Sequence, residues 1–199
     1  MNSNIASSKS LGFGVLAIAS WMFFVTHSGL VAPAGVDHGV MHAVMCIAAI
    51  GLLIAGIMAF VRHEGWLAFF FLLWAGMAWA SSQPMGWHGG GGDMGHGSAL
   101  FDAWFFITIT LVNLYLWLGS MKNRKLGGAV SITVLLIWVA WLLMALACFL
   151  NIWILGRIGG VVGLASAVVA FYVSAGSVLA ENGGRKLPCI GGEDHGGQA

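Results

Sequence analysis

The sequence between residues 11 and 180 is almost continuously apolar and is divided by five short breaks. Hydrophobic residues make up 59% of the chain and charged residues only 8%, so a soluble globule of this composition could not cover its surface with polar groups. A bilayer core about 30 Å thick requires roughly 20 apolar residues per helix. The pattern therefore predicts an integral membrane protein whose partner is the lipid bilayer.

Division of the apolar stretch on this scale predicts six transmembrane helices in a single domain of residues 1–199. The predicted spans are 11–31, 39–61, 66–82, 100–120, 126–150 and 158–180, followed by a tail at 181–199. These runs lack the two-residue alternation of lipid-facing strands, which argues against a barrel. The predicted fold class is all-α integral membrane, a six-transmembrane-helix bundle.

The basic residues give the bundle a predicted orientation. Those that fall at the two ends or in alternate breaks are Lys9, Arg62, Lys122, Arg124, Lys125, Arg185 and Lys186. Only Arg157 falls on the opposite side. Because lysine and arginine accumulate in short cytoplasmic segments, we predict cytoplasmic N- and C-termini and a multi-pass protein of the cell (inner or plasma) membrane. This distribution offers no basic face for a nucleic acid.

The first span has a second interpretation. Lys9, the apolar run and the segment Ala32-Pro33-Ala34 are also typical of a secretory signal peptide with its small-residue cleavage site. The apolar run of about 20 residues is longer than the usual signal-peptide core, which favours a retained helix.

The predicted spans contain few reactive groups. Cys46, Cys148 and Cys189 have no paired spacing, so we expect neither a disulfide framework nor a thiolate metal site. No lysine, arginine, aspartate or glutamate falls near the middle of a span, which argues against a charged proton relay. Since no nucleophile with a base and no carboxylate pair occurs at depth, we predict that the chain is not an enzyme and has no cofactor.

Small polar residues and glycines occur instead inside the spans. Thr110 and Asn113 are three residues apart and share a helix face, where they could bind a solute or stabilise helix packing by hydrogen bonds. The last span carries small residues at four-residue spacing, Gly156 with Gly160 and Gly159 with Gly163. This spacing allows two helices to approach closely, but it does not identify the partner helix.

Most histidines fall in the predicted external segments. His38 and His42 are four residues apart on one helix face, and His88 and His96 flank a glycine-rich loop. Imidazoles at such spacing can bind zinc or copper, and they can also titrate near neutral pH as part of an external gate. A solvated glycine-rich loop explains the pattern as well, so we predict no metal site and keep these four residues as its candidates.

Two terminal segments resemble a known family. The segment Leu-Gly-Phe-Gly at 11–14 and the segment Leu-Ala-Glu-Asn-Gly-Gly-Arg-Lys-Leu-Pro-Cys-Ile-Gly at 179–191 resemble the acetate and succinate transporter family of bacteria, archaea and fungi. Ala-Gly at 55–56 and Leu-Gly-Ser-Met-Lys at 118–122 resemble the ends of that family's second and fourth helices.

The resemblance implies a homohexamer in which each protomer has its own path for small monocarboxylates. It also implies a hydrophobic constriction, which by position would consist of Phe13, Trp74 and Val134. The family has phenylalanine, tyrosine and leucine there, so a larger aromatic and a smaller aliphatic side chain would alter the preferred substrate.

The predicted function is therefore a membrane channel or transporter for small monocarboxylates such as acetate, with proton-linked passage. A bare carboxylate is strongly disfavoured in an apolar constriction, which favours passage of the neutral acid. Thr110 and Asn113 are then predicted polar contacts, and His38 and His42 are predicted proton-sensitive groups at the external mouth. Two alternatives are a channel for neutral solutes such as ammonia or urea, and a metal-handling or accessory membrane subunit with an external histidine and methionine site.

Overall fold

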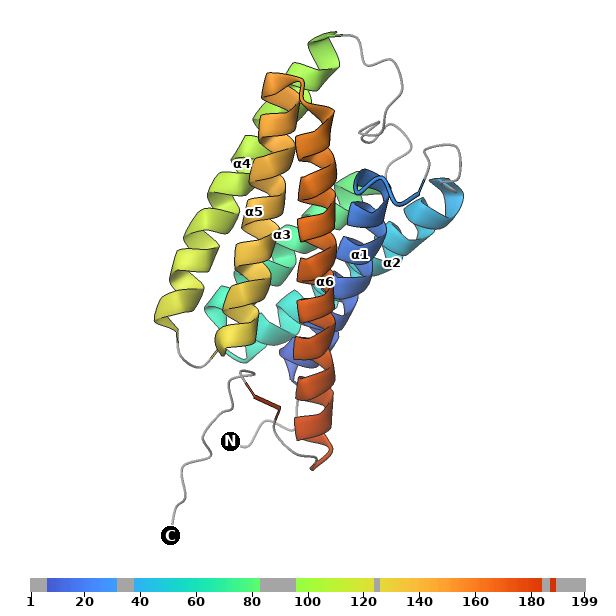
Figure 1. Ribbon diagram of the computed structural model, residues 1–199. Helices are drawn as coiled ribbons and strands as arrows, with labels where there is room; N and C mark the ends of the chain where they lie inside the picture. Colours follow the sequence, from blue (N-terminus) through green and yellow to red (C-terminus); the bar gives the residue numbers. More distant parts are fainter. Residues whose placement is uncertain (1–6, 32–37, 83–95, 124–125, 184–186, 189–199) are drawn as a thin grey trace.

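The computed structural model describes residues 7–31, 38–82, 96–123, 126–183 and 187–188, with only the backbone described for 38, 96–99 and 101. Its regular structure over these residues is entirely helical (Figure 1). The helices are α1 (Ser8–His27), α2 (His38–Val61), α3 (Gly65–Ser81), α4 (His96–Lys122), α5 (Gly128–Leu150) and α6 (Trp153–Glu181).

Five of these helices, all except α3, are long and apolar enough to cross a membrane. The exception is apolar as well but has only 17 residues, a length of about 26 Å at 1.5 Å per residue. The chain is therefore an all-helical, multi-pass membrane protein built as a six-helix bundle.

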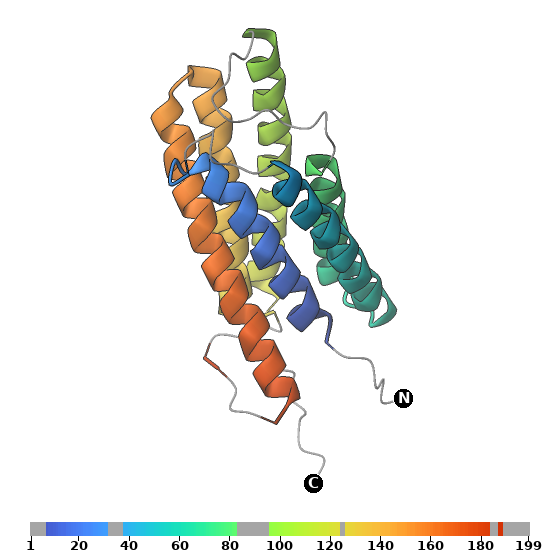
Figure 2. The ribbon, with the colours of Figure 1, turned by 90° about the vertical axis from the view of Figure 1, so that its right-hand side faces the viewer.

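The helices form a ring in which each helix lies beside its neighbours in the chain, and the first and last helices, α1 and α6, also pack together. The ring runs α3, α2, α1, α6, α5 and α4, and a small contact between α3 and α4 closes it. Figures 1 and 2 show α1 between α6 and α2, and α1 also touches α3. Because α1 carries buried side chains from Ser8 to Phe24, it is part of the bundle core, which favours its interpretation as a retained helix.

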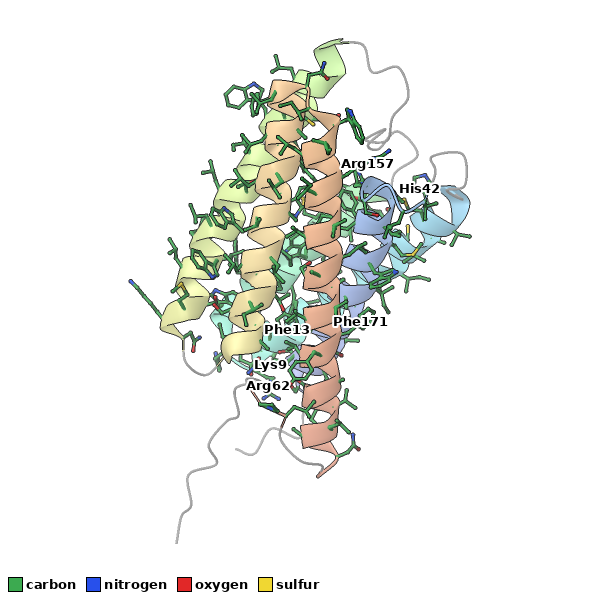
Figure 3. The ribbon with its side chains drawn as sticks, in the orientation of Figure 1. Lys9, Phe13, His42, Arg62, Arg157 and Phe171 are labelled. Carbon is green, nitrogen blue, oxygen red and sulfur yellow. The ribbon has the colours of Figure 1, made fainter. Side chains whose placement is uncertain are left out.

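The described basic residues are distributed unequally between the two ends of the bundle. Lys9 and Arg62 lie at the end where α1 begins and α6 finishes, and Arg157 lies at the opposite end (Figure 3). The connection from α4 to α5, which follows Lys122, is at the same end as Lys9 (Figure 1). We call the end with Lys9 and Arg62 the basic end.

Several helices begin or end at residues that differ from the sequence-based spans. The first helix ends at His27, and Gly29 then adopts a φ of +77°, a left-handed conformation that glycine tolerates. The last helix begins at Trp153, ahead of the predicted residue 158. Arg157 does not stop this helix, because its guanidinium carbon lies 4.3 Å from the centre of the Trp153 ring.

The glycines of α6 contact two neighbouring helices of the same chain. A Cβ atom at Gly160 would lie 2.5 Å from the backbone nitrogen of Ser28, and one at Gly163 would overlap the Phe24 ring of α1. On the other side, a Cβ atom at Gly159 would lie 3.0 Å from the carbonyl oxygen of Ala140 in α5. The partner helices that the glycine spacing left open are therefore α1 and α5.

Candidate permeation path

A small cavity lies between four helices, α1, α2, α3 and α5. Its walls are formed by Ala19, Ser20, Phe23, Phe24, Met45, Leu52, Trp74, Met77, Ala78, Ser81 and Trp141. The residues from α1 belong to its second half, and Ser81 is the final residue of α3. The cavity is therefore in the half of the bundle opposite the basic end.

The cavity wall is almost entirely apolar. The described residues that line it include no lysine, arginine, aspartate or glutamate. The lining residues with polar side-chain atoms are Ser20, Ser81, Trp74 and Trp141. The Ser81 hydroxyl donates a hydrogen bond of 2.9 Å to the Met77 carbonyl of its own helix. An ion in this cavity would lose its hydration shell without meeting an opposite charge.

A cluster of aromatic side chains continues from the cavity toward the basic end. We call Phe13, Phe70, Phe71 and Trp74 the aromatic plug. Phe13 stacks on Phe70 with ring centres 5.8 Å apart and meets Phe71 edge-on at 5.3 Å. Phe70 contacts Trp74 at 6.4 Å, edge to face. These side chains are at most 7% exposed, so they close the space between α1 and α3 with rings in favourable geometries.

The plug is connected to the cavity and to the basic end by further aromatic contacts. The ring centres of Trp74 and Trp141 are 6.1 Å apart, and the ring centres of Trp141 and Phe23 are 5.2 Å apart. On the other side, Trp66 stacks on Phe70 at 5.1 Å, and its indole N–H donates to the Leu116 carbonyl of α4 at 3.1 Å. The aromatic contacts thus run from the start of α3 to the cavity.

The opening segment of α1 explains how Phe13 reaches this position. A Cβ atom at Gly12 would overlap the Phe71 ring, so the absence of a side chain there lets α3 approach. A Cβ atom at Gly14 would lie 2.8 Å from the Ser174 hydroxyl of α6, which donates a hydrogen bond of 2.7 Å to the Ser10 carbonyl. The two glycines therefore hold the Phe13 turn of α1 between α3 and α6.

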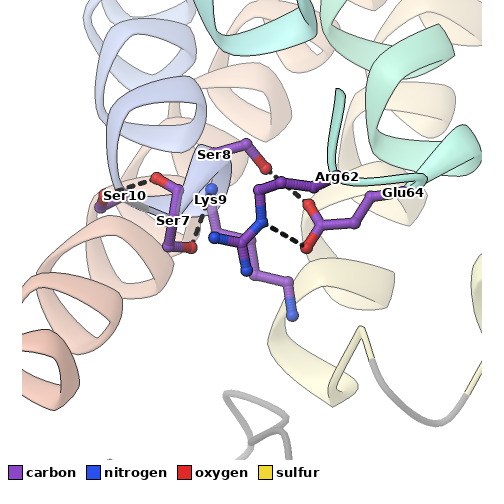
Figure 4. Close-up of polar contacts among 6 residues, drawn as sticks. All are labelled: Ser7, Ser8, Lys9, Ser10, Arg62 and Glu64. Carbon is purple, nitrogen blue, oxygen red and sulfur yellow. Dashed lines mark hydrogen bonds and ion pairs between the residues drawn. The ribbon is translucent and has the colours of Figure 1, made fainter. Parts of the chain in front are cut away.

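A polar cluster lies at the basic end, next to the start of α1 (Figure 4). The Ser8 hydroxyl donates to one carboxylate oxygen of Glu64, and the Arg62 guanidinium forms an ion pair with the other at 3.2 Å. The Ser7 side chain accepts a hydrogen bond of 3.2 Å from the backbone N–H of Lys9 and caps the helix. This cluster joins α1 to the turn between α2 and α3.

The residues of the predicted constriction are all buried. Phe13 and Val134 are fully buried and Trp74 is 7% exposed. Phe13 and Trp74 are connected through Phe70, whereas Val134 lies on α5 about two helical turns before Trp141 and therefore on the same helix face. Of the three, Trp74 lines the cavity described above.

The predicted polar contacts are buried on α4. The Thr110 hydroxyl donates to the Phe106 carbonyl at 2.8 Å, and the Asn113 amide donates to the Ile109 carbonyl at 2.9 Å. Both bonds are within the helix, and neither residue is among those that line the cavity. The Asn113 Oδ1 atom is buried and has no hydrogen-bond partner within the described part of the chain.

The predicted external histidines are described only in part. His42 is half-buried in α2, and its Nδ1 atom is buried without a partner among the described residues. The side chains of His38 and His96 and the whole of His88 lie outside the described residues. Within that description, no three residues of the types His, Cys, Asp and Glu lie close enough to hold a metal ion.

Most aromatic residues of this region were not identified from the sequence, and Phe70, Phe71 and Trp141 are examples. One signal that points to the first two is their spacing, since they precede Trp74 by four and three residues on one helix face. Trp141 shares a face with Val134 by the same argument, but nothing in its local sequence separates it from the lipid-facing tryptophans.

No protein-family model and no curated protein sequence matches the chain. Among solved structures, the bacterial acetate channel SatP is similar, with a TM-score of 0.77 and 19% sequence identity. The match covers 94% of this chain and 100% of that one. The chain therefore has the same six-helix membrane fold as a bacterial acetate channel, which is the fold that its terminal segments implied.

Proposed function

We propose that this chain is a membrane channel or transporter for small monocarboxylates such as acetate, with one path in each protomer. The proposal is carried by one observation: an uncharged cavity ends at an aromatic plug, in a fold shared with a protein described as an acetate channel. In this proposal Phe13, Trp74 and Val134 form the constriction. The family resemblance adds a homohexamer to the proposal, and the distribution of basic residues favours cytoplasmic termini.

The composition of the cavity favours proton-linked passage. Transfer of an isolated carboxylate from water into an apolar environment costs several kcal/mol even after the protein relaxes. The described cavity walls supply no cationic side chain to offset this cost. A carboxylic acid that carries its proton has no net charge and avoids most of the penalty. We therefore expect the neutral acid to pass the plug.

The same apolar path also fits a channel for neutral nitrogen compounds, so the experiment must separate the two. Purified protein in liposomes should take up labelled acetate faster than protein-free liposomes do, and the difference should increase as the external pH falls. Methylammonium, an analogue of ammonium, should not enter faster than in the protein-free control. Methylammonium uptake without acetate uptake would overturn the proposal in favour of the neutral-solute channel.

A further inference from the structure

Trp74 combines a position on the cavity wall with an unused hydrogen-bond donor. Trp74 is only 7% exposed, and it lines the cavity. Its Nε1 atom is buried and has no hydrogen-bond partner within the described chain. Most buried N–H groups in folded proteins are paired, so this exception requires an explanation.

Another tryptophan of α3, Trp66, shows that an indole N–H on this helix can find a hydrogen-bond acceptor within the bundle. The indole N–H of Trp66 donates to the Leu116 carbonyl at 3.1 Å. Trp138 of α5 also has an unpartnered indole nitrogen among the described residues, but it stacks on Trp117 and does not line the cavity. Trp74 thus combines an open hydrogen-bond donor with a position on the cavity wall, a combination that neither Trp66 nor Trp138 has.

We infer that the indole N–H of Trp74 is the donor that binds an oxygen of the carboxylic ligand in this cavity. An indole nitrogen donates a hydrogen bond and cannot accept one. The ligand must therefore present an acceptor, as the carbonyl oxygen of a carboxylic acid or a carboxylate oxygen does. Ammonium offers only donors and would gain nothing from this group. The inference rests on the proposed function and assigns Trp74 a binding role besides its steric role in the plug.

The uncharged character of this donor suits passage through the plug. A lysine or arginine here would hold the ionised carboxylate and slow its release, whereas conduction requires binding that is weak enough to permit exit. A single neutral donor can orient the acid and then release it. The apolar side chains around Trp74, including Met77 and Leu52, suit the alkyl part of the ligand.

The test compares three variants by acetate counterflow in liposomes. Trp74→Phe keeps an aromatic ring but removes the donor, and we expect its half-saturating acetate concentration to rise roughly tenfold, the change that loss of one hydrogen bond produces. Trp74→Tyr supplies a hydroxyl donor and should lie closer to the wild type. Trp138→Phe removes the same type of unpartnered N–H away from the cavity and should leave the concentration unchanged. Equal half-saturation in Trp74→Phe and the wild type would overturn the inference.

A second measurement tests the hydrogen bond by NMR. It requires neither transport activity nor a variant that conducts acetate. In ¹⁵N-labelled, detergent-solubilised protein, the indole resonance that is missing from Trp74→Phe should shift when acetate is added and should not shift with methylammonium chloride. If the wild-type protein transports no acetate, the proposed function fails. The response of the Trp74 indole resonance to acetate then still shows whether Trp74 binds the ligand. An unchanged resonance at saturating acetate, propionate and butyrate would refute it.

Discussion

The Ser8 hydroxyl donates a 2.7 Å hydrogen bond to the Glu64 carboxylate, which joins the first turn of α1 to the connection between α2 and α3. These residues are separated by 56 positions in the sequence. Ser8 is fully buried, and the other carboxylate oxygen of Glu64 pairs with Arg62. The hydrogen bond therefore fixes the turn of α1 that precedes Phe13 relative to α3, which carries the rest of the aromatic plug.

Replacement of Ser8 should destabilise the bundle at this end. Ser8→Ala leaves the Glu64 carboxylate without its buried donor, and loss of a hydrogen bond to a charged group costs roughly 1.5–3 kcal/mol. We expect a lower melting temperature of the solubilised protein. Ser10→Ala is the matched control, since the Ser10 hydroxyl bonds only locally, to the Ser7 carbonyl at 3.0 Å. Equal melting temperatures of Ser8→Ala and Ser10→Ala would show that the hydrogen bond between Ser8 and Glu64 does not stabilise the packing of α1 against α3.

The close approach of α6 to α1 should not tolerate a larger residue at Gly163. A methyl group there would overlap the Phe24 ring, and overpacking of this kind typically costs about 1–3 kcal/mol. We therefore expect Gly163→Ala to lower the melting temperature and to disturb the cavity that Phe24 lines. Gly76→Ala in α3 is the control, because a Cβ atom at Gly76 meets no atom within 4 Å. A Gly163→Ala protein as stable as the Gly76→Ala protein would contradict the packing described for α6.

The number and type of the helices could be predicted from the sequence because each requirement is local. A membrane helix must be apolar over its whole length and must satisfy its own backbone, so the length of an apolar run is sufficient to identify it. Helix ends were less predictable. The sequence placed the start of the last helix after Arg157, but a cation over the Trp153 ring at the bundle end lets the helix begin earlier.

The residues around the cavity could not be identified in the same way. In a soluble helix the polar face marks the solvent, but lipid-facing and core-facing positions of a membrane helix are both apolar. Trp79, which is 54% exposed, and Trp74, which is 7% exposed, are therefore indistinguishable by residue type. Polar residues at depth were equally ambiguous, since Thr110 and Asn113 donate to carbonyls of their own helix.

Phe13 should control which ligands pass the plug. Phe13→Leu removes the ring contacts with Phe70 and Phe71 and leaves space between α1 and α3. We expect faster counterflow of acetate and a relative gain for butyrate, with a stability loss of about 1–2 kcal/mol. Phe171→Leu is the control, because Phe171 is on α6 and is 41% exposed (Figure 3). Unchanged butyrate-to-acetate ratios in Phe13→Leu would exclude Phe13 from the constriction.

The orientation of the bundle can be tested by labelling from each side of the membrane. We expect Lys122→Cys to react with a membrane-impermeant maleimide only from the cytoplasmic side and Ile154→Cys only from the outside, in a chain whose three native cysteines are replaced. Both side chains are exposed and belong to opposite ends of the bundle. Labelling in the reverse pattern would invert the orientation and place the cavity on the cytoplasmic side.

The most direct measurement of the proposed function is counterflow of labelled acetate by the unmodified protein in liposomes, against unlabelled acetate, propionate and butyrate. An uncharged cavity ending at an aromatic plug predicts exchange above the protein-free rate, greatest for acetate and falling as the chain lengthens. Acetate exchange no faster than in protein-free liposomes, with folded protein present in the membrane, would contradict the proposal that this bundle conducts small monocarboxylates.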